Sequence, residues 1–158
     1  MVLNITIFIL IIFMTILLGG CTETTKNDSD EDVKSHQINF SIGHLGTIFP
    51  FDQDFENIVN TFTEWNAIPQ LIELDAKYDE EFFVNNSLII HAFVRGWSPV
   101  QTEITKVSRK GNELTVDVIH TEGNDAMMWY GIVIIEVAKK DIINVNSLRI
   151  ECLVLFGR

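Results

Sequence analysis

The histidines and cysteines of this sequence, which can act as general bases, nucleophiles or metal ligands, stand far apart in the chain. The 158 residues include four histidines and two cysteines. None of them belongs to a Walker phosphate loop, a Gly-x-Ser-x-Gly nucleophile elbow or a His-Glu-x-x-His zinc helix. Because these short motifs are what hold reactive groups at working distance, we predict that the protein is not an enzyme and has no catalytic residues.

Two of the histidines fall on predicted strands. His91 and His120 are separated by one intervening strand and could meet across a sheet as a metal pair. A single histidine on a strand is more often satisfied by an ordinary hydrogen bond. His44 stands between two glycines with no cysteine or acidic residue near it in sequence, which is typical of a solvated loop histidine. We therefore expect no metal site and no cofactor.

The two cysteines have different surroundings. If Cys21 carries lipid, Cys152 has no partner in the chain, which excludes a disulfide framework. Cys152 alternates with the apolar residues Leu148, Ile150 and Val154 along a predicted strand. This pattern predicts a buried, unreactive structural thiol.

Three carboxylates were candidates for chemistry. Glu103 and Asp117 fall on successive predicted strands, and carboxylates about 5–9 Å apart can hydrolyse glycosides. Such pairs are common on solvated faces, and no cluster of aromatic residues accompanies this one. Glu136 lies within the most apolar predicted strand, where an ionised carboxylate needs a partner. Arg149 or Lys106 is the expected partner.

The first twenty residues predict an export signal. Residues 5–18 form an apolar run broken only by Thr6 and Thr15. This run is shorter than the roughly 20 apolar residues of a spanning helix and has the length of a signal core. No Lys or Arg lies within residues 1–20. That leaves open the alternative that residues 2–18 are retained as an uncleaved anchor helix with Cys21 unmodified.

Residues 18–21 define the expected anchor. Leu18-Gly19-Gly20-Cys21 resembles the lipobox of bacterial lipoproteins, an aliphatic residue and two small residues before a cysteine. The resemblance implies cleavage between Gly20 and Cys21 and diacylglycerol on Cys21. The expected location is the extracytoplasmic face of the cell membrane, with the lipid as the membrane contact.

Residues 21–37 predict a flexible acidic tether, because a segment so polar cannot bury enough apolar area to offset its ordering entropy. The chain has 11 Lys and Arg against 22 Asp and Glu, a formal net charge of −11. The only adjacent basic pairs are Arg109-Lys110 and Lys139-Lys140. A nucleic-acid partner needs a basic surface, so we exclude one. The same charge disfavours electrostatic docking on anionic lipid.

Residues 38–158 carry the periodic patterns of one folded domain. Thr61 and Glu64 have the spacing of a capping box, which predicts a helix beginning at Phe62, and Asp79 is placed to cap a short turn at Phe82. Glycines and Pro50 predict a loop over residues 43–50. Period-two patterns predict strands at Ile38–Ile42, Leu88–Val94, Val100–Lys110, Glu113–Thr121, Trp129–Ala138 and Ser147–Phe156.

These elements predict an α+β fold. We expect a mostly antiparallel sheet of about five or six strands, curled or barrel-like, with one or two helices packed on it. Trp129–Val137 is apolar on both faces, which predicts a central strand.

Three segments point to a family. Tyr78–Phe83, Leu88–Val94 and Met127–Val137 together resemble exported bacterial proteins related to the C-terminal domain of the protease-complex subunit PrcB. The resemblance spans residues 57–140. It implies a non-catalytic module that associates with another exported protein.

The expected function is therefore that of a lipid-anchored accessory or interaction protein. Trp97, in a predicted exposed turn, and Asp125, in a predicted loop, are candidate partner-binding residues. The Trp97 ring would alternatively fold back over the edge of the sheet. A small-ligand-binding lipoprotein or an undetected hydrolase is the alternative function.

Overall fold

The computed structural model describes residues 34–47, 53–71, 74, 77–95, 99–123 and 128–156. The strands are β1 (His36–Gln37), β2 (Phe40–Thr47), β3 (Phe55–Val59), β4 (Asn86–Arg95), β5 (Pro99–Lys110), β6 (Glu113–Glu122), β7 (Trp129–Ala138) and β8 (Ser147–Phe156). The helices are α2 (Phe62–Asn66) and α3 (Phe82–Asn85), with 3-10 turns η1 (Pro69–Leu71) and η2 (Lys139–Ile142). Among these residues, none of the helices has the length and apolar character needed to cross a bilayer.

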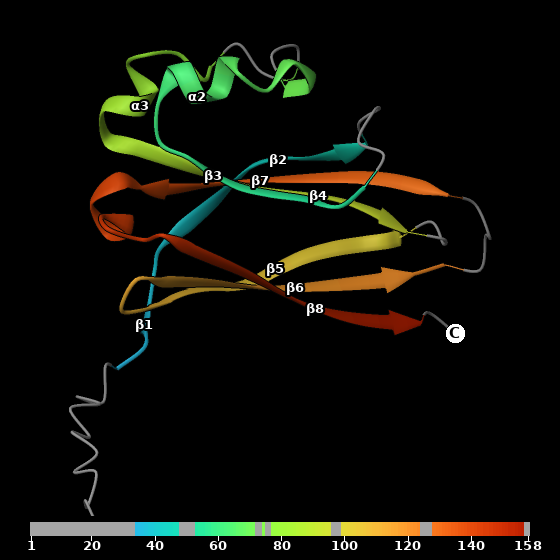
Figure 1. The fold of residues 1–158 in the computed structure, drawn as a ribbon. Coiled ribbons are helices and arrows are strands. Elements are labelled where there is room, and N and C mark those ends of the chain that lie inside the picture. The colour runs from blue at the N-terminus through green and yellow to red at the C-terminus, as the bar shows by residue number, and fades with distance from the viewer. Residues whose placement is uncertain are drawn as a thin grey trace, which may run out of the picture. The chain divides into compact units, whose positions relative to one another are not determined.

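The described strands form two stacked sheets of four strands each, in the orders β1-β5-β6-β8 and β2-β7-β4-β3 (Figure 1). All neighbouring strands run antiparallel except β6 and β8, which are parallel. The mostly antiparallel α+β class is therefore confirmed. The sheets are not closed into a barrel, and β4 and β5, expected to be neighbours in one curled sheet, lie in different sheets. The sandwich forms because stacking the two sheets covers an apolar face of each.

The two faces of the β2-β7-β4-β3 sheet are both buried, by different partners. Ile89 and Phe93 of β4 pack between the two sheets, whereas Leu88 and Ile90 pack on the side of the helices. Figure 1 shows α2 and α3 on that outer side. Strand β7, between β2 and β4, is buried on both faces, so the prediction of a central strand at Trp129 is confirmed.

The predicted helix starts are confirmed by their capping bonds. The Thr61 hydroxyl accepts a hydrogen bond from the Glu64 amide at 3.1 Å, and α2 begins at the next residue, Phe62. The Asp79 carboxylate accepts from the Phe82 amide at 2.9 Å, where α3 begins. Each bond satisfies an amide that the helix itself leaves without a partner.

The first part of the domain differs most from the sequence prediction. Residues 43–47, expected in a loop, continue β2 through an irregularity between Ile42 and His44. Strand β3 was not predicted. His36 and Gln37, placed in the tether by the sequence, form β1 and pair with Arg109 and Ser108 of β5. Glycine and charge content favoured loops here, but backbone pairing with β7, β4 and β5 overrides that local preference.

Candidate functional site

Three side chains that can bind metals meet between the two sheets: His91 of β4, His120 of β6 and Cys152 of β8. One ligand atom from each lies within 4.8 Å of the others. The Nε2 atom of His91 is 3.8 Å from the sulfur of Cys152. No other group of three or more His, Cys, Asp or Glu residues with this proximity occurs in the described part of the chain. This His-His-Cys cluster is the candidate site.

Strand periodicity explains why these side chains face each other. His91 shares a face of β4 with the core residues Ile89 and Phe93, and His120 shares a face of β6 with the core residue Val118. Cys152 pairs in register with Val118 on the neighbouring strand. All three side chains therefore project into the layer between the sheets.

The two imidazoles are fully enclosed by protein. His91 is 1% exposed and His120 is 0% exposed. The Phe93 ring packs against both, with centroids 5.1 Å from His91 and 4.4 Å from His120. The side of the site that faces the core is therefore apolar. Electrostatic attraction between charged groups there is only weakly screened by solvent.

Each histidine has an oxygen near its Nδ1 atom. The Thr102 hydroxyl is 3.0 Å from His120 Nδ1, and a Glu56 carboxylate oxygen is 3.5 Å from His91 Nδ1. Among described residues, His120 Nε2 and His91 Nδ1 are buried without a hydrogen-bond partner. An orphaned buried nitrogen is uncommon and calls for an explanation.

Cys152 occupies the boundary between this cluster and solvent. The residue as a whole is exposed, so the prediction of a buried residue is wrong, although its sulfur is partly buried against His91. The reason is that β8 is an edge strand: β6 is its one paired neighbour among the described strands. Alternation with Leu148 and Ile150 correctly indicated the inward face but could not show that the strand lies at the edge of its sheet.

Burial sets the protonation of all three groups. It is the largest cause lowering the pKa of His91 and of His120 from 6.5 to about 4, with the nearby Arg95 charge acting in the same direction. Burial also raises the pKa of Cys152, outweighing the opposing effect of Arg95. A neutral imidazole beside a protonated thiol is not the ion pair of a cysteine nucleophile. Neutral imidazole is, however, the form that binds metals.

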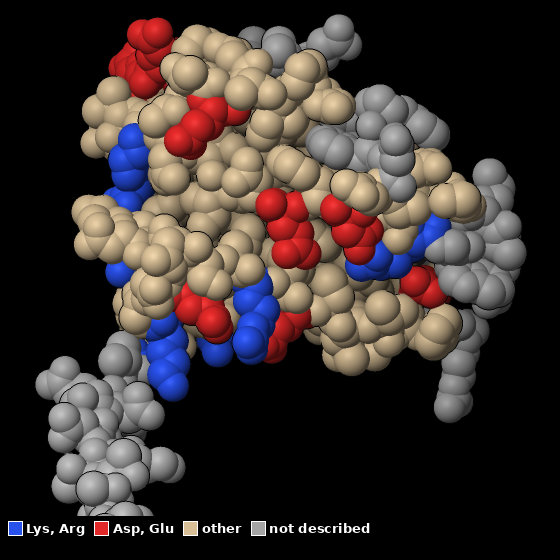
Figure 2. Space-filling view, in the orientation of Figure 1, with Lys and Arg blue, Asp and Glu red and all other residues tan. Residues whose placement is uncertain are grey.

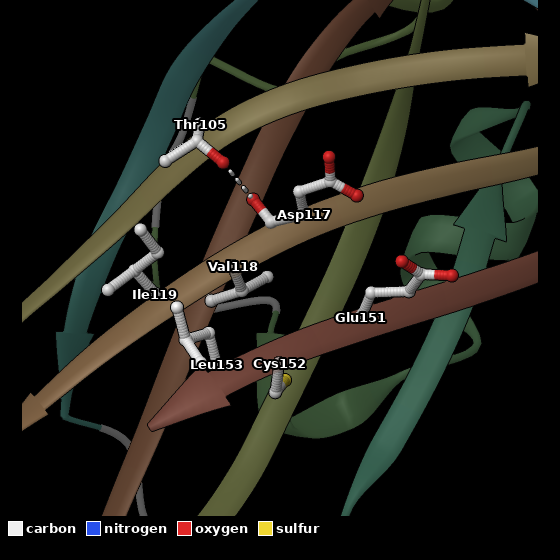
Figure 3. A pocket seen from close by; sticks show the side chains of 7 residues that line it. All are labelled: Thr105, Asp117, Val118, Ile119, Glu151, Cys152 and Leu153. Atoms are coloured by element: carbon white, nitrogen blue, oxygen red, sulfur yellow. Dashed lines mark hydrogen bonds between the residues drawn. The ribbon is translucent and has the colours of Figure 1, made fainter. Parts of the chain in front are cut away.

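The outer side of the same region is a shallow pocket of about 320 Å³ over β5, β6 and β8 (Figure 3). Its lining residues are Thr105, Asp117, Val118, Ile119, Glu151, Cys152 and Leu153. The Thr105 hydroxyl donates to the backbone carbonyl of Asp117 at 3.3 Å. Cys152 therefore borders this pocket as well as the cluster.

The structure does not bring the other chemical candidates together. Glu103 pairs in register with Ile119, and Asp117 pairs with Lys106, so the two carboxylates are not direct neighbours. His44 lies on β2 rather than in a loop, and its Nε2 atom is buried.

Glu136 is paired, as its position in an apolar strand required, but not with Arg149 or Lys106. Its Oε1 atom is 2.7 Å from Lys77 Nζ and accepts a hydrogen bond from the Tyr78 hydroxyl at 3.1 Å. Both partners come from the segment before α3.

Several predicted sites lie outside the described residues. These are the cleavage and lipidation residues Gly20 and Cys21 and the candidate partner-binding residues Trp97 and Asp125.

Cys152 was not predicted as a site residue. Its place beside the histidines depends on the parallel pairing of β6 with β8, for which the sequence carries no local signal.

Comparison with known proteins adds no relative: no family model, curated protein or solved structure matches the chain.

Proposed function

We propose that this protein is a non-catalytic accessory protein, anchored by lipid on Cys21 to the extracytoplasmic face of the cell membrane, that docks another exported protein along the open edge of β8. The partner would add an extended strand to the β1-β5-β6-β8 sheet. The observation that carries the proposal is the exposed apolar character of the last four residues of this edge strand, Leu153 to Phe156.

Strand β8 has ten residues, and three large apolar side chains near its end are exposed. The exposed fractions are 54% for Leu153, 44% for Leu155 and 73% for Phe156. Figure 2 shows a largely uncharged surface over this half of β8. Proteins usually protect such an edge with charges, proline or a covering segment, because unpaired backbone groups beside apolar side chains recruit another strand. The other edge strand of the sheet, β1, has only two residues.

Three further features support a tethered, non-catalytic interaction role. The lipobox-like sequence ending at Cys21 and the acidic segment that follows it would hold the domain near the membrane surface. The one Cys and His pair in contact among the described residues is neutral, which is not the state of a cysteine nucleophile. The resemblance to PrcB-related exported proteins also implies association with another exported protein.

The test is site-specific crosslinking in intact membranes. A photoreactive amino acid replaces Leu155 in the full chain, and a matched control replaces Glu103, an exposed residue on β5 of the same sheet that β6 separates from β8. We expect a product of defined mass from position 155 that is absent from position 103. Mass spectrometry of the product should identify an exported protein.

Leu153→Lys in the Leu155 crosslinking background should remove the product, since a charge on the edge opposes strand addition. A product containing only two copies of this chain would contradict docking of a different protein. Equal products from positions 155 and 103 would contradict a role for the β8 edge.

A further inference from the structure

We propose that His91, His120 and Cys152 form a binding site for one transition-metal ion of the thiolate- and imidazole-preferring class, Zn²⁺ or Cu⁺. The site goes beyond the docking function above, and its test requires no partner protein.

The distances suit a metal. A Zn²⁺ ion has bonds of about 2.3 Å to sulfur and about 2.0–2.1 Å to imidazole nitrogen, which at trigonal or tetrahedral angles hold the two ligand atoms about 3.5–3.8 Å apart. The observed separation of His91 Nε2 and Cys152 Sγ is 3.8 Å. The remaining separations are at most 4.8 Å, so small side-chain rotations complete the site.

The atoms around the histidines suit ligands rather than ordinary core residues. Metal-binding histidines usually donate their second ring N–H to an oxygen, which fixes the ring and directs the other nitrogen at the metal. Thr102 provides that oxygen for His120, at 3.0 Å from Nδ1. The Glu56 carboxylate lies 3.5 Å from His91 Nδ1 without a hydrogen bond, so a small side-chain movement would let it accept from that atom. Both Nε2 atoms are then available to the ion.

The strongest single observation is the Nε2 atom of His120. It is buried without a hydrogen-bond partner among the described residues, in a side chain that is 0% exposed. A neutral histidine with Nδ1–H donated to Thr102 leaves a lone pair on Nε2. A metal ion held with His91 and Cys152 would satisfy that lone pair.

The ligand set restricts the ion. One thiolate and two imidazoles favour Zn²⁺ and Cu⁺ over Mg²⁺ and Ca²⁺, which prefer oxygen ligands. Binding converts the Cys152 thiol to thiolate, and the proton leaves to solvent. Cys152 is exposed at the edge of the sandwich, so it provides the entry route and leaves room for water as a fourth ligand.

Cobalt titration of the full chain, purified in detergent under reducing conditions after chelator treatment, tests the proposal. We expect one Co²⁺ per chain, a thiolate-to-cobalt charge-transfer absorption in the near ultraviolet, and displacement of Co²⁺ by Zn²⁺. Cys152→Ser should abolish the absorption. His120→Asn should weaken binding at least about tenfold, and Thr102→Val, which removes only the supporting oxygen, about ten- to a hundredfold.

Two control variants isolate the site. His36→Asn removes an exposed imidazole from β1 and Cys21→Ala removes the other cysteine; both should bind as the unmodified chain does. Zn²⁺ should also protect Cys152 from a thiol reagent, which tests the site without any substitution.

The proposal would be overturned if the folded, unmodified protein gave no charge-transfer band on addition of Co²⁺. It would also be overturned if the band persisted in Cys152→Ser, or if His120→Asn bound Co²⁺ with unchanged affinity. Zn²⁺ that leaves the reaction of Cys152 unchanged would also overturn it. Circular dichroism of each variant shows that it is folded.

Discussion

The Nε2 atom of His91 lies 3.8 Å from the sulfur of Cys152, although 61 positions separate the two residues in the chain. The contact bridges the two sheets, from β4 in one to the edge strand β8 of the other. Because it joins an enclosed imidazole to an exposed residue, the two partners should respond differently to pH, substitution and reagents.

Stability should fall in mild acid. The folded pKa values of His91 and His120 are about 4, below the usual 6.5, so the unfolded chain binds protons that the folded chain does not. The free energy of unfolding of metal-free protein should therefore decrease as pH falls from 6.5 to 4 and receive no further contribution from these groups below 4. The loss from the two histidines together is on the order of a few kcal/mol. Urea unfolding at each pH measures it.

The variant His120→Gln separates this effect from the titration of carboxylates. The free energy of unfolding of this variant should fall about half as steeply between pH 6.5 and 4, because one of the two titrating groups is removed. A profile with the same slope in the variant would contradict the assignment to these histidines.

Cys152→Ser should change the free energy of unfolding of metal-free protein by no more than about 0.5 kcal/mol, because the residue is exposed. The sequence alone predicted burial. A thiol reagent should modify native Cys152, at a rate that rises with pH, since burial of the thiol raises its pKa. Reaction only after unfolding would show that the sulfur is inaccessible.

Gly43→Ala should destabilise the protein by about 1–3 kcal/mol. A Cβ atom at this position would collide with the Tyr78 hydroxyl and lie 2.7 Å from Glu136 Oε1. Thermal unfolding measures the effect, with Ser41→Ala as a control that removes only a hydrogen bond to Glu136. Adding Tyr78→Phe should recover part of the loss, because it removes the oxygen that collides. No recovery would locate the strain elsewhere.

Cys21→Ala should abolish incorporation of a fatty-acid probe, because the proposed lipid is attached to that sulfur. Metabolic labelling followed by gel fluorescence provides the measurement, and Cys152→Ser provides the matched control, which should label normally. Label retained on the Cys21 variant would remove the basis for a lipid anchor.

Much of the fold follows from patterns that are local in sequence. Strands β7 and β8 begin and end where period two predicts, the turn at Gly111 has the positive φ of 63° that glycine accommodates, and Thr61 caps α2. These features depend on residues a few positions apart, which is why the sequence suffices.

Only part of the candidate site could be predicted from the sequence. His91 and His120 were recognised as residues that could meet, since both occupy strands. The sequence could not place Thr102 and Glu56 beside them, because those contacts depend on register across β5 and β3. The sequence also did not identify Cys152 as the third member of the His-His-Cys cluster, because its alternation with apolar residues predicted a structural thiol in the core.

The sequence by itself determined the five strands β4 to β8, the helix starts, the acidic charge and the need of Glu136 for a partner. Only the tertiary structure decided that the strands divide into two sheets, that β6 and β8 run parallel, and that β8 is an edge. The physical reason is that alternation fixes which face of a strand is apolar, whereas the choice of neighbour depends on burial summed over the whole domain. That choice turned an apparently buried cysteine into an exposed residue beside two buried histidines.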